Sequence, residues 1–288
     1  MKRQNPKPKE IYQAKINEPD RPIGRTIPIP AERHARILEF LSRHGAASIH
    51  AIAAELSVSA STIRRDLDDL TETGYLERSH GGAVLRSRTL TTFEPSREIA
   101  ERLALSEKIA IGAFAASLLE NNQSVIFDSS STVAEAARAV VARDMTLTAI
   151  STDIGIAQEL NKSPRIRVIV PGGTMRKESL TLTGDPALGL LATINVEVGL
   201  IGIHSLAGLK PSETTLEIAA MKKALIAACQ HIVLLADSTK FTNPAFCEVA
   251  KIEAFHHLVT DDGITDELRH ALNQRGIKVT AVPGKMIK

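Results

Sequence analysis

Apolar residues recur at helical spacing in the first part of the chain, once a proline-rich start has passed. This spacing predicts helices over residues 31–44, 48–56 and 59–73, with a glycine just after the first and the last of them. A tight turn at Ser57 and Val58 separates the second and third helices. Two short β-prone runs around the Gly-Gly pair of YLERSHGGAVL then predict a hairpin. Two short helices across a tight turn, followed by a hairpin, are typical of a winged helix-turn-helix.

Beyond Phe93 the pattern changes to an alternation of strands and helices. Alanine-rich or amphipathic stretches separate most of the short apolar runs, which predicts βαβ units and a mostly parallel, doubly wound sheet. The predicted strands begin near Ser124, Thr146, Arg165, Val196, His231, His257 and Lys278. The predicted fold class is therefore α/β, with a flexible proline-rich arm over residues 1–30, a winged helix-turn-helix over 31–88 and a larger α/β domain over 93–288.

Composition excludes several classes of protein. Apolar residues make up 43% of the 288 residues, enough for packed cores, and no apolar run reaches the ~18–20 residues of a membrane span. The N-terminus lacks the apolar segment of a secretory signal. Cys229 and Cys247 are too few for a disulfide framework or a four-ligand zinc site, and they suit a reducing cytoplasm. We predict a cytoplasmic protein with no cofactor and no metal.

The charge of the chain is unevenly distributed. The whole chain has 35 Lys and Arg against 33 Asp and Glu, a net charge of +2. Residues 1–92 hold 15 basic and 11 acidic residues, a net +4, and the remaining residues hold 20 and 22, a net −2. Such asymmetry is a hint that the N-terminal part binds nucleic acid.

The start of the third predicted helix carries side chains suited to DNA. Hydroxyls can bond phosphates and base edges, and arginine can donate two hydrogen bonds to guanine in the major groove. The candidates are Ser59, Ser61, Thr62, Arg64 and Arg65 on this helix, with Arg78 and His80 on the hairpin. The alternative is that Arg64 and Arg65 only form ion pairs with acids such as Asp68 and Asp69 on a solvated helix.

The motif around this helix resembles that of a known family. The string VSASTIRRDLDDLTETGYLERSHGGA resembles the VSxxTIRRDLxxLxxxGxLxRxHGGA signature of the DeoR family of bacterial transcription regulators. The resemblance implies sequence-specific binding to double-stranded operator DNA, by a homodimer or homotetramer on symmetric half-sites. Ser57 departs from the pattern, because the family usually has glycine in this turn and serine is less comfortable in a left-handed conformation.

The C-terminal ends of the predicted strands carry groups suited to an anion. Open α/β sheets bind ligands at this edge, and hydroxyls with free amides at a helix N-terminus can hold a phosphate. The segments concerned are SSST at 129–132, STD at 151–153, PGGTMRK at 171–177 and ADSTK at 236–240. Each also has a structural interpretation, as a helix cap, a turn or a surface ion pair.

The resemblance to the DeoR family extends over this second part. Phe93, Arg97 and Lys108 are similar to the family's F..R…K..IA segment, and DSSST, STD, VIVPGG and ADSTKF are similar to its later motifs. It implies the fold of ribose-5-phosphate isomerases and a phosphorylated sugar as effector. The implied effector-binding residues are Asp128, Ser129, Ser131, Thr132, Thr152, Asp153, Gly172, Gly173, Arg176, Asp237 and Lys240.

Two positions in these motifs depart from the family pattern. Ser130 replaces a glycine, which restricts how closely the backbone can approach a phosphate, and Asp153 replaces an asparagine. A carboxylate beside a phosphate is unfavourable unless Arg176 or Lys240 neutralises it, so we expect Asp153 to bond a sugar hydroxyl instead.

The leading interpretation is a repressor of a carbohydrate-metabolism operon that a phosphorylated sugar relieves or modulates, with no catalytic residues. One alternative is a phosphosugar isomerase with an appended helical module, in which Asp237 and Lys240 would supply the base and the electrophile. No second carboxylate is convincingly placed for that reaction. Another alternative is an adaptor that uses the winged helix to bind protein, which replacement of Arg64 and Arg65 by alanine would distinguish.

Overall fold

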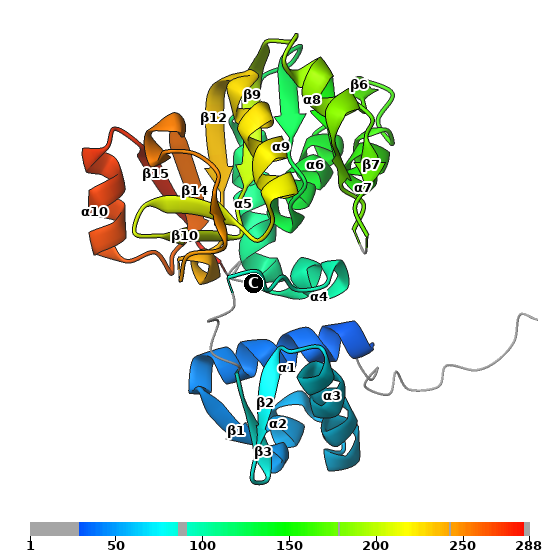
Figure 1. The fold of residues 1–288 in the computed structure, drawn as a ribbon, viewed down its shortest axis with the longest axis vertical. Coiled ribbons are helices and arrows are strands. Elements are labelled where there is room, and N and C mark those ends of the chain that lie inside the picture. The colour runs from blue at the N-terminus through cyan, green and yellow to red at the C-terminus, as the bar shows by residue number, and fades with distance from the viewer. Residues whose placement is uncertain (1–28, 86–90, 178, 242, 285–288) are drawn as a thin grey trace, which may run out of the picture.

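A computed structural model describes residues 29–85, 91–177, 179–241 and 243–284 (Figure 1). Nearly all of the proline-rich arm, residues 1–28, lies outside the described residues, as do Arg86 to Leu90. The described chain forms a winged-helix module, residues 29–85, and an α/β module that begins at helix α5 (Leu105–Ser117).

The winged-helix module consists of three helices and a small antiparallel sheet of strand order β1-β3-β2. Its elements are α1 (Pro30–His44), β1 (Ala46–Ser48), α2 (Ile49–Leu56), α3 (Ala60–Glu72), β2 (Leu76–Ser79) and β3 (Gly82–Leu85). The apolar faces of the helices meet in one core that includes Ile37, Leu41, Ile52, Ile63 and Leu67, all fully buried. The three predicted helices and the hairpin are confirmed. Strand β1 was not predicted, because three residues carry too little pattern.

Serine side chains fix where two of these helices begin. Ser48 Oγ accepts a hydrogen bond from the Ala51 amide at the start of α2, and Ser59 Oγ accepts one from Thr62 at the start of α3. Ser57 ends α2 in the left-handed conformation, with φ of 56°. The departure from glycine at this position therefore costs backbone strain rather than changing the turn.

The segment between the modules packs against both of them. Helix α4 (Arg97–Arg102) lies between the winged helix and the sheet, and α5 (Leu105–Ser117) follows it (Figure 1). Ile99 is buried in the core of the winged-helix module, and Phe93 and Leu103 pack against the same core.

Within the described residues, seven parallel strands form the sheet of the α/β module, in the order β15-β14-β12-β9-β4-β5-β6. The strands are β4 (Ser124–Phe127), β5 (Leu147–Ser151), β6 (Ile166–Ile169), β9 (Val196–Gly202), β12 (Cys229–Leu235), β14 (His257–Asp261) and β15 (Lys278–Val282). Each corresponds to one of the seven strand starts predicted from the sequence. The mostly parallel α/β fold is confirmed.

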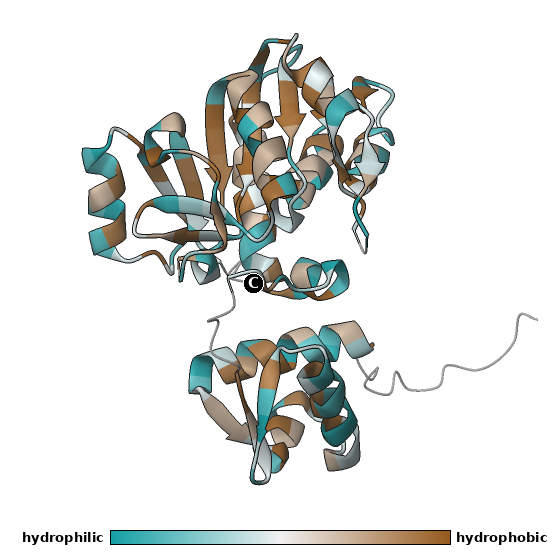
Figure 2. Cartoon of the chain, in the orientation of Figure 1, coloured by the Kyte–Doolittle hydropathy of each residue, from teal (hydrophilic) through white to brown (hydrophobic). Residues whose placement is uncertain are grey.

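Helices cover both faces of this sheet, as a doubly wound fold requires. Helices α5, α6 (Ser131–Ala142) and α7 (Ile154–Leu160) bury one face. Helices α8 (Asp185–Leu191), α9 (Leu216–Ala227) and α10 (Asp266–Gln274) bury the other. The strands between these layers are largely hydrophobic (Figure 2), because they are buried on both sides.

Short antiparallel pieces that were not predicted lie beside the sheet. The pieces are β7 (Thr174–Met175) with β8 (Leu182–Thr183), and β10 (Ser205–Ala207), β11 (Lys210–Glu213) and β13 (Cys247–Glu248). The described residues also include two short 3-10 helices, η1 (Ser238–Lys240) and η2 (Ile252–Ala254). In the part of the chain that the structure describes, no helix has the length and apolar character needed to cross a bilayer. Cys229 and Cys247 are free thiols.

Candidate DNA interface and effector site

The N-terminal turn of α3 presents an exposed group of hydroxyls and two arginines. Ser59 Oγ lies 2.9 Å from Ser61 Oγ and 2.8 Å from Thr62 Oγ1, so one cap orders the hydroxyls. Arg64 and Arg65 follow on the exposed side of the helix. Among the described residues, neither arginine has a carboxylate within 4.0 Å, so the ion pairs with Asp68 and Asp69 that the structural alternative requires are not formed there.

A buried ion pair sets the position of α3 against α1. Arg33 Nε and Nη2 donate to the two carboxylate oxygens of Asp66, at 2.8 and 2.6 Å, and both residues are buried. Burial acts to raise the pKa of Asp66, but the Arg33 guanidinium outweighs it and holds that pKa below its ordinary value. The sequence signal for this pair was Asp66 itself, a carboxylate on the same helix face as Ile63 and Leu67.

The hairpin places its two candidate side chains in solvent. Arg78 and His80 are exposed, on β2 and at the turn into β3. Arg78 Nε lies 3.5 Å from Asp68 Oδ1, so the hairpin arginine, rather than Arg64 or Arg65, contacts an acid of the recognition helix. Such an exposed pair is weak.

One cluster near this interface has the residue types of a metal site. His34, Asp66 and Asp69 each offer a ligand atom, and these atoms lie within 4.8 Å of one another. The carboxylate of Asp66 is already held by both donors of the Arg33 guanidinium, whose positive charge opposes a cation at this place. The cluster is therefore better suited to hold the helices together than to bind a metal.

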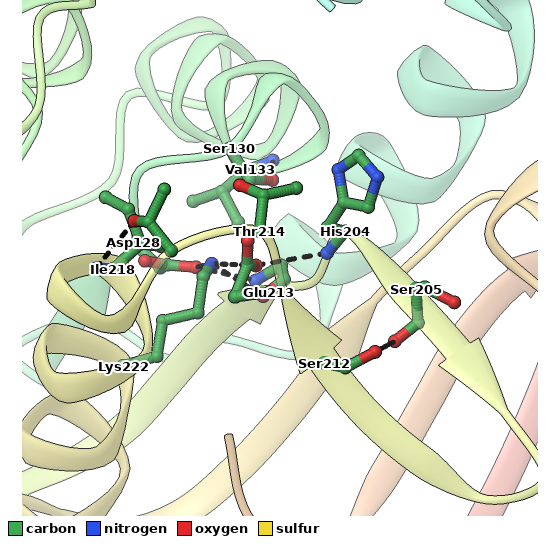
Figure 3. Close-up of polar contacts among 12 residues, drawn as sticks. Asp128, Ser130, Val133, His204, Ser205, Ser212, Glu213, Thr214, Ile218 and Lys222 are labelled. Carbon is green, nitrogen blue, oxygen red and sulfur yellow. Dashed lines mark hydrogen bonds and ion pairs between the residues drawn. The ribbon is translucent and has the colours of Figure 1, made fainter. Parts of the chain in front are cut away.

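A buried charged network lies beneath the C-terminal ends of β4 and β9 (Figure 3). Lys222 Nζ, from α9, forms ion pairs with Asp128 and with Glu213 Oε1, the latter at 3.4 Å. Burial acts to lower the pKa of Lys222, but Asp128 and Glu213 outweigh it and raise that pKa. Burial raises the pKa of Glu213. Asp128 also accepts a hydrogen bond from the Gly202 amide at 2.9 Å. This predicted effector residue therefore holds the end of β9.

The serine-rich loop above Asp128 begins helix α6 and is open to solvent on one side. Ser130 Oγ accepts from the Val133 amide at 3.2 Å and thus caps the helix. Ser129 and Ser131 are half-buried and Thr132 is buried. Ser130 packs where a side chain at Gly202 would stand, since a Cβ there would lie 2.3 Å from Ser130 Oγ. The serine in place of the family's glycine is therefore accommodated by a glycine on the neighbouring strand.

Arg97, which was not among the candidate site residues, neutralises Asp153. Its Nη1 donates to Asp153 Oδ2 at 2.9 Å, and Asp153 Oδ1 caps α7 by accepting from Ile156 at 3.0 Å. Among the described residues the cation paired with Asp153 is Arg97, and not Arg176 or Lys240, the two considered from the sequence. Arg176 instead donates two hydrogen bonds to Glu94, at 3.1 and 2.6 Å. Residues more than fifty positions apart form both pairs, which explains why no local pattern revealed them.

Asp237 and Lys240 lie at the end of β12, beside a lysine that the site prediction did not include. Asp237 Oδ1 accepts from the Thr239 amide at 3.2 Å, while its buried Oδ2 has no hydrogen-bond partner among the described residues. Lys108 of α5 is buried nearby and donates to the Ala100 carbonyl. Burial lowers the pKa of Lys108 to about 8, against the attraction of Asp237.

Gly172 and Gly173 shape a turn. Both have positive φ, 86° and 124°. A Cβ at Gly173 would lie 2.6 Å from the Thr183 carbonyl oxygen, so the glycine allows β7 and β8 to approach. Thr152 is buried under the same edge, and its Oγ1 has no hydrogen-bond partner among the described residues.

A cleft of about 1600 Å³ lies between the winged-helix module and the strand ends. The predicted effector residues that line it are Ser129, Ser131, Thr132, Asp153, Arg176, Asp237 and Lys240. Asp128, Thr152, Gly172 and Gly173 do not line it. Lys108, Glu94 and Arg97 also face the cleft. The arrangement offers hydroxyls, a helix N-terminus and cations together, which is the chemistry that binds a phosphorylated ligand.

Comparison with protein families places a model on each module. Residues 33–89 match the "DeoR-like helix-turn-helix domain", and residues 104–262 match the "DeoR C terminal sensor domain". The second match alone covers more than half of the chain.

Individual relatives and one solved structure are similar to the chain to different extents. The "HTH-type transcriptional regulator GlpR" of Haloferax volcanii is 32% identical over 255 residues, 87% of this chain and 97% of the relative. The "HTH-type transcriptional repressor GlcR" of Bacillus subtilis is 30% identical over 250 residues, 86% and 95% of the two chains. Ribose 5-phosphate isomerase A from Neisseria gonorrhoeae has a TM-score of 0.37 at 15% identity, with 50% of this chain and 55% of that one covered.

Proposed function

The chain belongs to the DeoR family of helix-turn-helix transcriptional regulators, and from that premise we propose that it represses a carbohydrate-metabolism operon in response to a phosphorylated sugar. It is a regulator and not an enzyme, as the names of its relatives indicate. The observation that carries the proposal is the exposed pair Arg64 and Arg65, which has no carboxylate partner among the described residues, on a helix whose position a buried ion pair sets.

We propose that the helix α3 enters the major groove of operator DNA in the cytoplasm. Ser59, Ser61 and Thr62 would contact phosphates and base edges, Arg64 and Arg65 would contact bases, and Arg78 and His80 would reach the backbone or the minor groove. A homodimer or homotetramer would present two copies of α3 to symmetric half-sites.

Selection of bound duplexes from a random pool tests the DNA-binding part of the proposal. The selected duplex should bind with an affinity that falls as salt rises, because cations on DNA phosphates are released. Arg64→Ala and Arg65→Ala should each weaken binding by about 1–3 kcal/mol. Arg36→Ala, which removes the same charge from the exposed side of α1, is the matched control and should change affinity little. Unchanged affinity in both recognition-helix variants would favour the adaptor.

A thermal-shift screen of phosphorylated sugars tests the effector part of the proposal. A true effector raises the melting temperature by mass action and changes the affinity for the selected duplex. The corresponding sugars without phosphate should do neither. Thr132→Val, which removes a buried hydroxyl at the start of α6, should weaken the shift. If no phosphorylated sugar shifts the melting temperature, the effector assignment is wrong while the DNA assignment stands.

A further inference from the structure

Residues 93–104 join the winged-helix module to the cleft through two different sets of contacts. On one side, Ile99 is buried in the core of the winged-helix module. The Ser96 amide donates to the Tyr75 hydroxyl at 2.6 Å, and the Ala104 amide donates to Glu39 Oε1 at 2.9 Å. A shift of the winged-helix module is therefore expected to carry this segment with it.

The charged side chains of the same segment bind residues of the proposed effector site. Glu94 accepts two hydrogen bonds from Arg176, and its Oε2 also accepts from Thr214 Oγ1 at 3.0 Å. Arg97 donates to Asp153 at 2.9 Å. Lys108 donates to the carbonyl of Ala100, within α4. Through these contacts the segment already engages Arg176, a cation that could bind an anionic ligand, and Asp153, a carboxylate of the cleft.

The Glu94–Arg176 pair has the geometry by which arginine binds a phosphate. Two carboxylate oxygens face two guanidinium nitrogens, and two oxygens of a phosphate monoester would fit the same donors while carrying more charge. Burial acts to raise the pKa of Glu94, but Arg176 outweighs it and keeps the pKa below the ordinary value, so the carboxylate is ionised near neutral pH. About a third of each side chain is exposed, so a small ligand can reach the pair.

We propose that Glu94 is an internal anion that holds Arg176 in the absence of effector, and that the phosphate of the effector displaces it. This inference rests on the proposed effector function of the cleft. Displacement frees the N-terminal flank of α4 from the α/β module, and α4 is part of the core of the winged-helix module. The effector would therefore act on DNA binding by competing for one arginine, since a ligand shifts an equilibrium only through unequal affinity for the two states.

Binding of inorganic phosphate by titration calorimetry tests the competition. Glu94→Gln removes the competing charge and should bind phosphate at least about tenfold more tightly than the wild type, because Arg176 loses a charge-assisted partner. Glu98→Gln removes the same charge from an exposed position of α4 and is the matched control, with less than about a twofold change expected from the general loss of negative charge. Glu94→Asp keeps the charge on a shorter side chain and should give an intermediate phosphate affinity. If one of the two Glu94 variants fails to fold, the phosphate affinity of the other still tests the competition.

Hydrogen exchange in the wild-type chain tests the coupling. Saturating phosphate should speed exchange of the amides of Arg97 to Arg102, while those of α6 stay protected. Equal phosphate affinity in wild type and Glu94→Gln, or unchanged exchange in α4, would overturn this proposal and leave the effector site standing. If neither chain binds inorganic phosphate or any phosphorylated sugar, the effector function itself fails, and the competition proposal fails with it.

Discussion

Lys222 is the residue on which the two buried carboxylates at the strand ends depend. Removal of its charge leaves Asp128 and Glu213 buried without a cation, and breaking such a pair costs about 3–5 kcal/mol. Lys222→Met should therefore lower the free energy of unfolding by that amount, measured by urea denaturation. The loss should shrink at acidic pH, because burial raises the pKa of Glu213 and protonation removes one of the charges.

The adjacent Lys223→Met is the matched control for this prediction. Lys223 is exposed on the same helix, so its replacement should change the free energy of unfolding by less than about 0.5 kcal/mol. Similar losses in the two variants would mean that the buried network contributes no specific stability.

Lys108 gives the protein a pH-dependent stability that can be isolated by one substitution. Its pKa is about 8 in the folded chain, against the ordinary value of 10.5 that we take for the unfolded chain. Between these two pH values the unfolded chain binds more protons than the folded chain. The free energy of unfolding therefore rises with pH across this window, by at most about 3 kcal/mol for the full shift. Lys108→Met should lose this rise, measured as the difference from wild type in urea denaturation at the two ends of the window. A rise that persists in the variant would contradict the assignment to Lys108.

At the scale of elements, the Arg33–Asp66 pair determines how α3 lies against α1. Asp66→Ala removes the carboxylate that pairs with the buried Arg33 guanidinium and should destabilise the chain by about 3–5 kcal/mol, with weaker DNA binding because α3 loses its fixed position. Asp68→Ala, on the exposed side of the same helix, should leave stability almost unchanged. Chemical denaturation and binding to the selected duplex measure the two effects. Equal stability of the two variants would show that the buried pair is dispensable.

The sequence predicted the elements whose pattern is local and long enough to read. All seven strands of the parallel sheet come from β-branched or apolar runs bounded by turns, whereas β1, β7 and β10 have only two or three residues, too few to show a pattern. The same limit applies to the site. Lys222 is separated from Asp128 by 94 positions and Glu94 from Arg176 by 82, so no spacing along the chain could have joined them. The strand-end segments were found because a parallel sheet brings them to one edge.

At the scale of the whole molecule, we expect DNA affinity to depend on the number of half-sites more than on total charge. The recognition helix carries Arg64 and Arg65 but also three aspartates, and the whole chain has a net charge of only +2. A duplex with two correctly spaced half-sites should therefore bind about 10²–10⁴-fold more tightly than one with a single half-site. Gel-shift titration of the two duplexes at one salt concentration measures the ratio. Equal affinity would indicate that one copy of the winged helix suffices.

The burial of Ile99 in the winged-helix core has a consequence for protein engineering. A chimera that joins this DNA-binding part to a foreign sensor at residues 86–92 would leave behind the side chains that close its core, Phe93, Ile99 and Leu103. A junction after Leu103 would keep that core complete. It would, however, place Glu94 and Arg97 beside the cleft of a foreign sensor, which need not offer them the partners that Arg176 and Asp153 provide here. Exchange of DNA-binding specificity between relatives should succeed when residues 93–104 are transferred together with their partners in the cleft, Asp153 and Arg176.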